Sequence, residues 1–163
     1  MPINKFQLDE IDARLVDLLQ ADGRATQLEL AKAVRLSQPA VAERIRKLEQ
    51  AGVITGYRAQ VDPAKLGIDI TAFIGVSIEH PKYFEEFARV VLSLPEVLEC
   101  HRVAGLDSYL LKVRTANTQA LDELLVETLR TIAGVTRTHT TIVLSSIKEG
   151  SYIAPPSLDR AGD

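Results

Sequence analysis

The side chains best suited to binding a polyanion lie between positions 37 and 47, in a segment whose pattern predicts a short helix. Ser37 precedes that helix, where its hydroxyl and the adjacent free N–H groups can bond a phosphate oxygen. Gln38 can bond an adenine edge in a bidentate manner, and Arg46 can bond a guanine edge or a phosphate. Glu43 can accept a hydrogen bond from a cytosine amine or pair with Lys47 four residues later. The residues predicted to contact DNA are Ser37, Gln38, Pro39, Glu43, Arg44, Arg46 and Lys47.

Basic side chains are concentrated in the same part of the chain. The 163 residues hold 19 Lys and Arg against 22 Asp and Glu, a formal net charge of −3. Residues 24–58 hold seven basic and three acidic side chains, whereas residues 1–23 hold two and five, and residues 59–163 hold ten and fourteen. A polyanionic partner is therefore expected to bind within residues 24–58.

Three short helices are predicted to position these side chains. The first begins after an Asp9 N-cap and ends at Asp22-Gly23, where glycine favours a helix end at positive φ. The second begins with a Thr26–Glu29 capping box, and the third begins at Ser37 and ends at Gly52. Their amphipathic spacing indicates a helix-turn-helix, whose second helix can stand in a major groove. The side chains expected to pack together are Ile11, Leu15, Leu18, Leu19, Leu28, Ala31, Val34, Val41, Ile45 and Leu48.

Beyond residue 67 the pattern changes to alternating strands and helices. Strands are expected at Ile68–Glu79, Val97–Val103, Tyr109–Thr115 and from Val135, and helices at Phe84–Leu92 and Leu121–Ile132. The order β-α-β-β-α-β is the split βαβ, or ferredoxin-like, arrangement, in which the second and fourth strands form opposite edges of the sheet. The predicted fold class is therefore α+β.

These patterns divide the chain into four parts. Residues 1–52 are predicted to form the helix-turn-helix domain, 53–67 an extended, strand-like linker, 68–149 the ferredoxin-like domain and 150–163 a C-terminal tail over the surface. No apolar run approaches the ~20 residues that span a bilayer, and the N-terminus lacks a signal-peptide pattern. The chain is therefore expected to be cytoplasmic, with no membrane partner.

Four side chains are of types that serve in catalysis or metal binding: His80, Cys100, His101 and His139. Adjacent residues of a strand point to opposite faces, so Cys100 and His101 are not expected to form a nucleophile–base pair. His101 and His139 fall on opposite edge strands, ~14 Å apart, which disfavours an intrachain metal site and leaves one across a dimer interface open. No catalytic residue, metal ligand or cofactor is predicted, and the chain is not expected to be an enzyme.

A series of short motifs follows in order along the chain. They are Asp22-Gly23-Arg24, Leu30-Ala31, Leu36-Ser37, Arg44–Glu49, Gly52–Ile54, Tyr57–Ala59, Val61–Pro63, Leu66-Gly67, Val103–Gly105, Asp107–Val113, Gly134-Val135 and Thr138–Lys148. Over about residues 8–148 they closely resemble the Lrp/AsnC (leucine-responsive, or feast/famine) transcriptional regulators. The resemblance implies a winged helix-turn-helix with short strands beside its three helices, then an effector-binding domain that forms a homodimer and a higher oligomer such as an octamer. One departure is Arg35, where many members have glycine in the turn.

The resemblance also implies that an amino acid or similar small effector binds in the second domain, near contacts between dimers. The residues it implicates are Gly105, Asp107, Tyr109, Thr138 and Thr140. Asp107 can hold an α-ammonium group, while N–H groups of the glycine turn and the threonine hydroxyls can bond a carboxylate. The same residues also fit a hairpin turn capped by Asp107, ordinary strand-forming threonines and a core position for Tyr109.

Dimerisation is also predicted from the sheet itself. The first strand places Phe73 opposite the Ile70–Ile78 row, and the third strand adds Leu110, so both faces carry apolar side chains. Such a sheet favours face-to-face association of two chains, and a dimer would present two recognition helices ~34 Å apart. The predicted function is a sequence-specific DNA-binding regulator that a small effector modulates. The alternative is a metabolite-binding, protein-interaction module that does not bind DNA.

Overall fold

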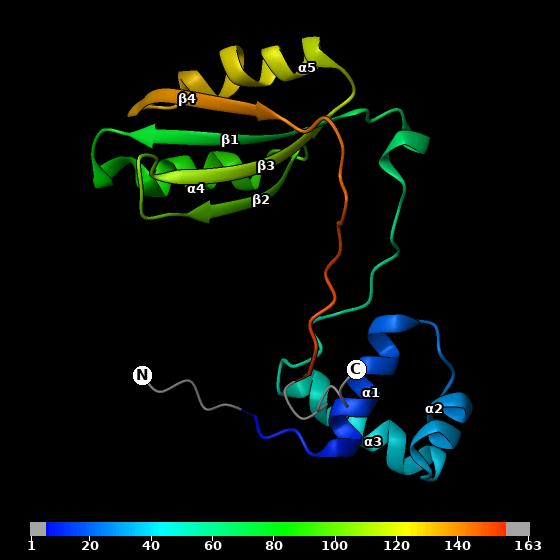
Figure 1. Cartoon of the computed structure of the whole chain (residues 1–163). Coiled ribbons are helices and arrows are strands. Elements are labelled where there is room, and N and C mark those ends of the chain that lie inside the picture. The colour runs from blue at the N-terminus through cyan, green and yellow to red at the C-terminus, as the bar shows by residue number, and fades with distance from the viewer. Residues whose placement is uncertain (1–5, 156–163) are drawn as a thin grey trace. The chain divides into compact units, whose positions relative to one another are not determined.

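The computed structural model describes residues 6–155, which form two compact units. Within those residues the first unit comprises 6–60 together with 149–155, and the second is Val61–Lys148 (Figure 1). The second unit thus begins a few residues before the predicted ferredoxin-like domain, and the residues after it return to the first unit.

Three helices build the first unit: α1 (Glu10–Ala21), α2 (Gln27–Val34) and α3 (Gln38–Gln50). Each begins at its predicted cap. The Asp9 carboxylate accepts from the Asp12 N–H at 2.7 Å, and the Ser37 hydroxyl accepts from the Ala40 N–H at 3.4 Å. The Thr26 hydroxyl accepts from the Glu29 N–H while the Glu29 carboxylate accepts from the Thr26 N–H, a complete capping box. These bonds satisfy N–H groups that have no partner inside the helix.

The core of the first unit follows the predicted amphipathic pattern, with one exception on α2. Leu28 is 47% exposed, whereas Leu30 and Ala31 are buried. At 3.6 residues per turn, the buried stripe of α2 runs between Leu30 and Ala31, and Leu28 lies about 110° away from it. The prediction that Leu28 packs inward was therefore wrong. The residues in this core are Ile11, Leu15, Leu18, Leu19, Ala25, Leu30, Ala31, Val34, Leu36, Val41 and Ile45.

Two backbone predictions near the ends of this unit also need correction. α1 ends at Asp22, which is extended (φ −142°), and Gly23 is not among the glycines with positive φ. Residues 53–62 contain no strand, so the short strands expected beside the three helices are absent from this segment. The N–H groups of Val53 and Ile54 both donate to the Leu48 carbonyl, which closes the end of α3 and leaves them unavailable to a strand partner.

The turn between α2 and α3 places Arg35 in a left-handed backbone conformation, which is unfavourable for a residue other than glycine. Arg35 has φ 56° and ψ 42°, and it is the one non-glycine residue with positive φ in the described part of the chain. Its N–H donates to the carbonyls of Ala31 and Lys32, and the Leu36 N–H donates to Ala31. These bonds close the helix in the left-handed manner for which glycine is usually required.

The second unit is an antiparallel sheet with helices on one face, as predicted (Figure 1). Its strand order is β2-β3-β1-β4, so β2 and β4 form the edges. The elements are β1 (Ile70–Ile78), α4 (Phe84–Leu92), β2 (Val97–Arg102), β3 (Tyr109–Thr115), α5 (Thr118–Glu123) and β4 (Val135–Ile142). A π-helical turn (Leu124–Thr128) and a 3-10 turn (Leu129–Thr131) continue α5, and two further 3-10 turns lie at Pro63–Leu66 and Pro81–Tyr83.

The two faces of this sheet differ in cover. The predicted inward row of β1 is buried against both helices, with Ala72, Ile74 and Val76 inaccessible to solvent. The opposite face, called here the open face, carries Phe73 and Leu110, which are 38% and 37% exposed. Both faces therefore carry apolar side chains, but only one is covered by helices of the same chain.

The segment after β4 returns to α1. The Tyr152 hydroxyl donates to Asp17 at 2.9 Å. The Gln20 amide both donates to the Ile153 carbonyl and accepts from the Ile153 N–H, each at 2.8 Å. Because one side chain satisfies both backbone groups of Ile153, this part of the predicted tail is bound in a defined position on the surface of α1.

The Arg35 turn yields the first prediction. Arg35→Gly should raise the free energy of unfolding of the first unit by about 1 kcal/mol, because glycine adopts this conformation without steric cost. Thermal unfolding measures the change. Arg35→Lys is the matched control, since it keeps the charge and the steric cost and should leave stability unchanged. Equal stability of the glycine and lysine variants would show that this turn carries no strain.

Candidate nucleic-acid interface and effector site

The exposed surface of α3 and its N-cap carries six of the seven residues predicted to contact DNA. Its inner stripe is fixed by Val41 and Leu48, both inaccessible to solvent. The side chains left exposed are Ser37, Gln38, Pro39, Glu43, Arg46 and Lys47. Ser37 and Gln38 stand at the start of the helix, where its free N–H groups also favour an anion. This face therefore offers hydrogen-bond donors and positive charge to a single partner.

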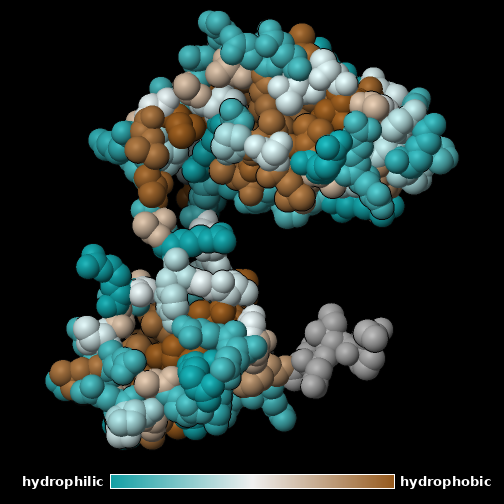
Figure 2. All heavy atoms as spheres, turned by 180° about the vertical axis from the view of Figure 1, so that it is seen from behind, coloured by the Kyte–Doolittle hydropathy of each residue, from teal (hydrophilic) through white to brown (hydrophobic). Residues whose placement is uncertain are grey.

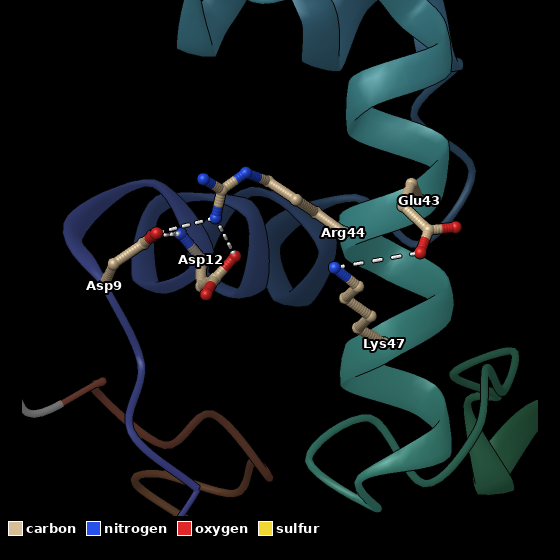
Figure 3. A network of polar contacts seen from close by, with 5 residues as sticks. All are labelled: Asp9, Asp12, Glu43, Arg44 and Lys47. Carbon is tan, nitrogen blue, oxygen red and sulfur yellow. Dashed lines mark hydrogen bonds and ion pairs between the residues drawn. The ribbon is translucent and has the colours of Figure 1, made fainter.

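Arg44 lies apart from the other six. Its guanidinium Nη1 donates to Asp9 and to Asp12 of the α1 start, each at 2.7 Å, and points toward α1 (Figure 3). The Asp12 N–H and the Arg44 guanidinium hold the pKa of Asp9 below its usual range. Hydrogen bonds to Asp9 and Asp12 in turn raise the pKa of Arg44. Arg44 therefore clamps α3 to α1, a role that is indicated in the sequence only by the acidic excess of residues 1–23.

Glu43 is bonded to two cations of its own helix. Its two carboxylate oxygens accept from Arg46 Nε at 2.9 Å and from Arg46 Nη2 at 2.6 Å. Lys47 Nζ lies 3.8 Å from the same carboxylate (Figure 3). These contacts, led by the Arg46 hydrogen bond, lower the pKa of Glu43 and raise that of Arg46. The i+4 pairing expected with Lys47 is thus present, and the closer partner is Arg46.

Asp107 is the predicted effector residue that lies on the open face of the sheet. Its carboxylate accepts from the Ser77 hydroxyl at 2.9 Å and from Arg137 Nη2 at 3.4 Å. It is pressed against Gly75, where an added Cβ would lie 2.2 Å from Asp107 Oδ2. The strand glycine therefore makes room for the carboxylate. An isolated glycine inside a strand pattern often marks such a close approach, and it was the available signal for this contact.

The structure does not bring the five predicted effector residues together. Cross-strand pairs of Thr138 with Val76 and of Thr140 with Ile74 place both threonines on the helix-covered face. Tyr109 is buried there as well, with its ring centroid 5.5 Å from that of Phe84 in an edge-to-face contact. Gly105 lies in the β2–β3 hairpin with no atom near its missing side chain. Asp107 is thus separated from Tyr109, Thr138 and Thr140 by the sheet itself.

A cavity of about 500 Å³ lies elsewhere in the second unit, and none of the five residues lines it. Its lining residues are Ile68, Leu94, Pro95, Glu96, Arg114, Thr115, Ala116, Ala120, Glu123, Leu124, Glu127 and Thr128. Asp107, with its partners Ser77 and Arg137, lies instead on the open face, which no helix of the same chain covers.

The histidines lie where the strand order predicts. His101 pairs with Leu110 of β3 and His139 with Gly75 of β1, so two strands separate them. Within residues 6–155, no three His, Cys, Asp or Glu side chains gather as metal ligands would. None of the helices in that range has the length and apolarity that a bilayer crossing requires.

Both units match known families. Residues 8–55 match the winged helix-turn-helix DNA-binding domain, and residues 71–153 match the Lrp/AsnC ligand binding domain. The leucine-responsive regulatory protein of Escherichia coli K12 is 39% identical over 148 residues, 90% of each chain. The chain belongs to the Lrp/AsnC family. This confirms the predicted fold and function class, an effector-modulated DNA-binding transcriptional regulator, and it confirms that the family is one of regulators rather than enzymes.

Solved structures of this family share the fold over nearly the whole chain. E. coli AsnC superposes with a TM-score of 0.86 at 32% identity, covering 92% of this chain and 100% of that one. A Neisseria meningitidis transcriptional regulator in complex with L-Met has a TM-score of 0.86 at 33% identity, covering 92% and 97%. A feast or famine regulatory protein from M. tuberculosis complexed with L-methionine has a TM-score of 0.84 at 40% identity, covering 91% and 100%.

The Arg44 clamp yields a pH prediction. Because the pKa of Asp9 is depressed in the folded state, its stabilising effect is complete above the unfolded pKa of about 4 and is lost as pH falls through the lower folded value. Asp9→Asn should therefore reduce stability at neutral pH, and its difference from the wild type should shrink as pH falls below about 4. The Asp9 side chain is 51% exposed, so solvent screening limits the loss to about 1 kcal/mol or less.

Urea unfolding between acidic and neutral pH measures this difference. Asparagine still caps a helix, so the substitution removes the charge and keeps the cap. Glu10→Gln removes a neighbouring exposed charge and serves as the control. A difference between Asp9→Asn and wild type that is the same at every pH would contradict the role given to the Asp9–Arg44 pair.

Proposed function

We propose that α3 enters the major groove of duplex DNA and reads it with the six exposed residues of its outward face. The observation that carries this proposal is the packing of α3, which buries Val41 and Leu48 and leaves Gln38, Arg46 and Lys47 exposed. Arg46 and Lys47 suit a guanine edge or the phosphates, and Gln38 suits an adenine edge. In this proposal Arg44 does not contact the DNA but holds α3 against α1.

The effector of this protein is proposed to be a free amino acid bound on the open face at Asp107. The L-methionine complexes of two related regulators support this ligand class. Asp107 would hold the ammonium group, and Arg137 beside it would hold the carboxylate, since a guanidinium and a carboxylate pair through parallel hydrogen bonds. Tyr109, Thr138 and Thr140 face the helices, so they are left out of this proposed site.

A second copy of the chain is proposed to cover the open face and form a homodimer, which assembles further, for example to an octamer. The exposure of Phe73 and Leu110 supports this, since an apolar sheet face is otherwise left in water. Figure 2 shows further apolar side chains on the surface of the second unit. By exposed fraction, the large apolar side chains of this unit that are most accessible are Leu92, Leu106, Leu144 and Ile147. A DNA-bound regulator of this kind is proposed to act in the cytoplasm.

The DNA contact is tested by Arg46→Ala combined with Lys47→Ala. Anisotropy titrations with duplex DNA at several salt concentrations should show weaker binding and a salt dependence shallower by about 0.9 for each phosphate that the protein no longer neutralises. Lys82→Ala combined with Arg89→Ala removes the same charge from the second unit and should bind nearly as wild type. If both double variants reduce affinity equally, α3 is not the recognition helix.

The effector site is tested by Asp107→Asn, with each amino acid screened for thermal stabilisation of the protein. Asparagine keeps the shape beside Gly75 but removes the charge, so the stabilisation by the active amino acid should disappear. Asp122→Asn, an exposed carboxylate on α5, is the control and should retain the full response. A full response by Asp107→Asn would place the ligand elsewhere.

A further inference from the structure

The ion pair between Glu43 and Arg46 occupies one edge of the Arg46 guanidinium. Nε and Nη2 donate to the two oxygens of Glu43, at 2.9 and 2.6 Å. A guanidinium carries five N–H donors, so three remain on its free end. That end still presents two adjacent donors, the arrangement that bonds the O6 and N7 acceptors of a guanine. The pair thus orients Arg46 without using up its capacity to read a base.

The same carboxylate changes the electrostatics of the recognition face. Arg46 and Lys47 bring two positive charges to this part of α3, and Glu43 neutralises one of them. A DNA phosphate that approaches Arg46 also approaches the negative charge of Glu43, whereas the edge of a guanine is uncharged. The carboxylate therefore penalises a phosphate contact more than a base contact at the same guanidinium.

The pair is also weak enough to break. The side chains of Arg46 and Glu43 are 53% and 47% exposed, and an exposed pair of this kind contributes little to stability. On an unrelated sequence, where no base edge matches, a phosphate at the free end of Arg46 is repelled by the carboxylate of Glu43, and Arg46 gains a full-strength phosphate contact only by giving up Glu43. On a matched sequence it keeps Glu43 and adds the base. The pair therefore favours the matched sequence.

We propose that Glu43 is a positioning residue that holds Arg46 away from the phosphates and so raises the preference of this protein for its own DNA site over unrelated DNA. The inference rests on the proposed function of α3. It assigns Glu43 an action through Arg46 rather than a direct contact with a cytosine.

The test uses Glu43→Gln in the full-length protein. A duplex selected from a random pool by the wild type serves as the matched site, and an unrelated duplex of equal length serves as the reference. Glu43→Gln should bind the unrelated duplex more tightly, by up to about five-fold, the range an exposed ion pair supports. Its salt dependence on that duplex should be steeper by about 0.9, because Arg46 then contacts one more phosphate. The ratio of matched to unrelated affinity should fall.

Two further variants separate this role from simple charge removal. Glu49→Gln makes the same change on the same helix, where the carboxylate accepts from the Tyr57 hydroxyl at 3.0 Å instead of from a cation. It should give a smaller increase in affinity and no steeper salt dependence. In an Arg46→Ala background the effect of Glu43→Gln on the unrelated duplex should vanish, which a double-mutant cycle measures.

Three outcomes would overturn the inference. Weaker matched binding by Glu43→Gln with unchanged unrelated binding would mean that Glu43 reads a base directly. Equal effects of Glu43→Gln and Glu49→Gln on affinity would show that the change in net charge alone accounts for the effect. Persistence of the effect without Arg46 would exclude action through that residue. Failure of the wild type to select any duplex would instead overturn the proposed function itself, so the two failures are distinguishable.

Discussion

Burial of one stripe of α3 decides what its other face can do. Val41 and Leu48 are inaccessible to solvent, and Ile45 packs with Val41 in the core of the first unit. Each such side chain contributes about 1.5–3 kcal/mol when fully buried, whereas an exposed ion pair contributes about 1 kcal/mol or less. The rotation of the helix about its axis is therefore set by these apolar contacts. The charged residues between them take the directions that remain.

Arg44 lies at the border between the buried stripe and the exposed surface of α3. It follows Glu43 directly, and one residue step turns a helix by about 100°. That turn carries Arg44 from the outward face to the boundary with α1, where two carboxylates hold it. Amphipathic spacing alone could not tell a phosphate contact from an interhelical clamp, because both uses demand a partly exposed arginine. The packing of the helices in the structure is what identifies Asp9 and Asp12 as the partners of Arg44.

What the sequence could and could not predict follows from the range of each interaction. Caps, helix faces and the inward row of β1 depend on neighbours within a few residues, so Asp9, Thr26 and Ser37 were placed correctly. The strand order also followed from the element order. The face on which the predicted effector threonines lie could not be predicted, because it depends on register: β4 pairs Thr140 with Ile74, and a shift of one residue would have turned it to the open face. The strands expected after α3 are missing because a strand requires a hydrogen-bonded partner strand, and residues 53–62 have none.

In the first unit, two sets of contacts between residues far apart in the sequence involve α1. The Gln20 and Asp17 side chains hold the segment that follows the second unit, while Asp12, on the same helix, holds Arg44 of α3. A chain of direct contacts therefore joins the returning segment to α3 within one unit. An effector can alter DNA affinity only if it binds two arrangements of the protein with different free energies, and the DNA then alters effector affinity by the same factor. Because surface hydrogen bonds and ion pairs are weak, contacts of this kind can exchange between arrangements without unfolding the apolar core that orients α3.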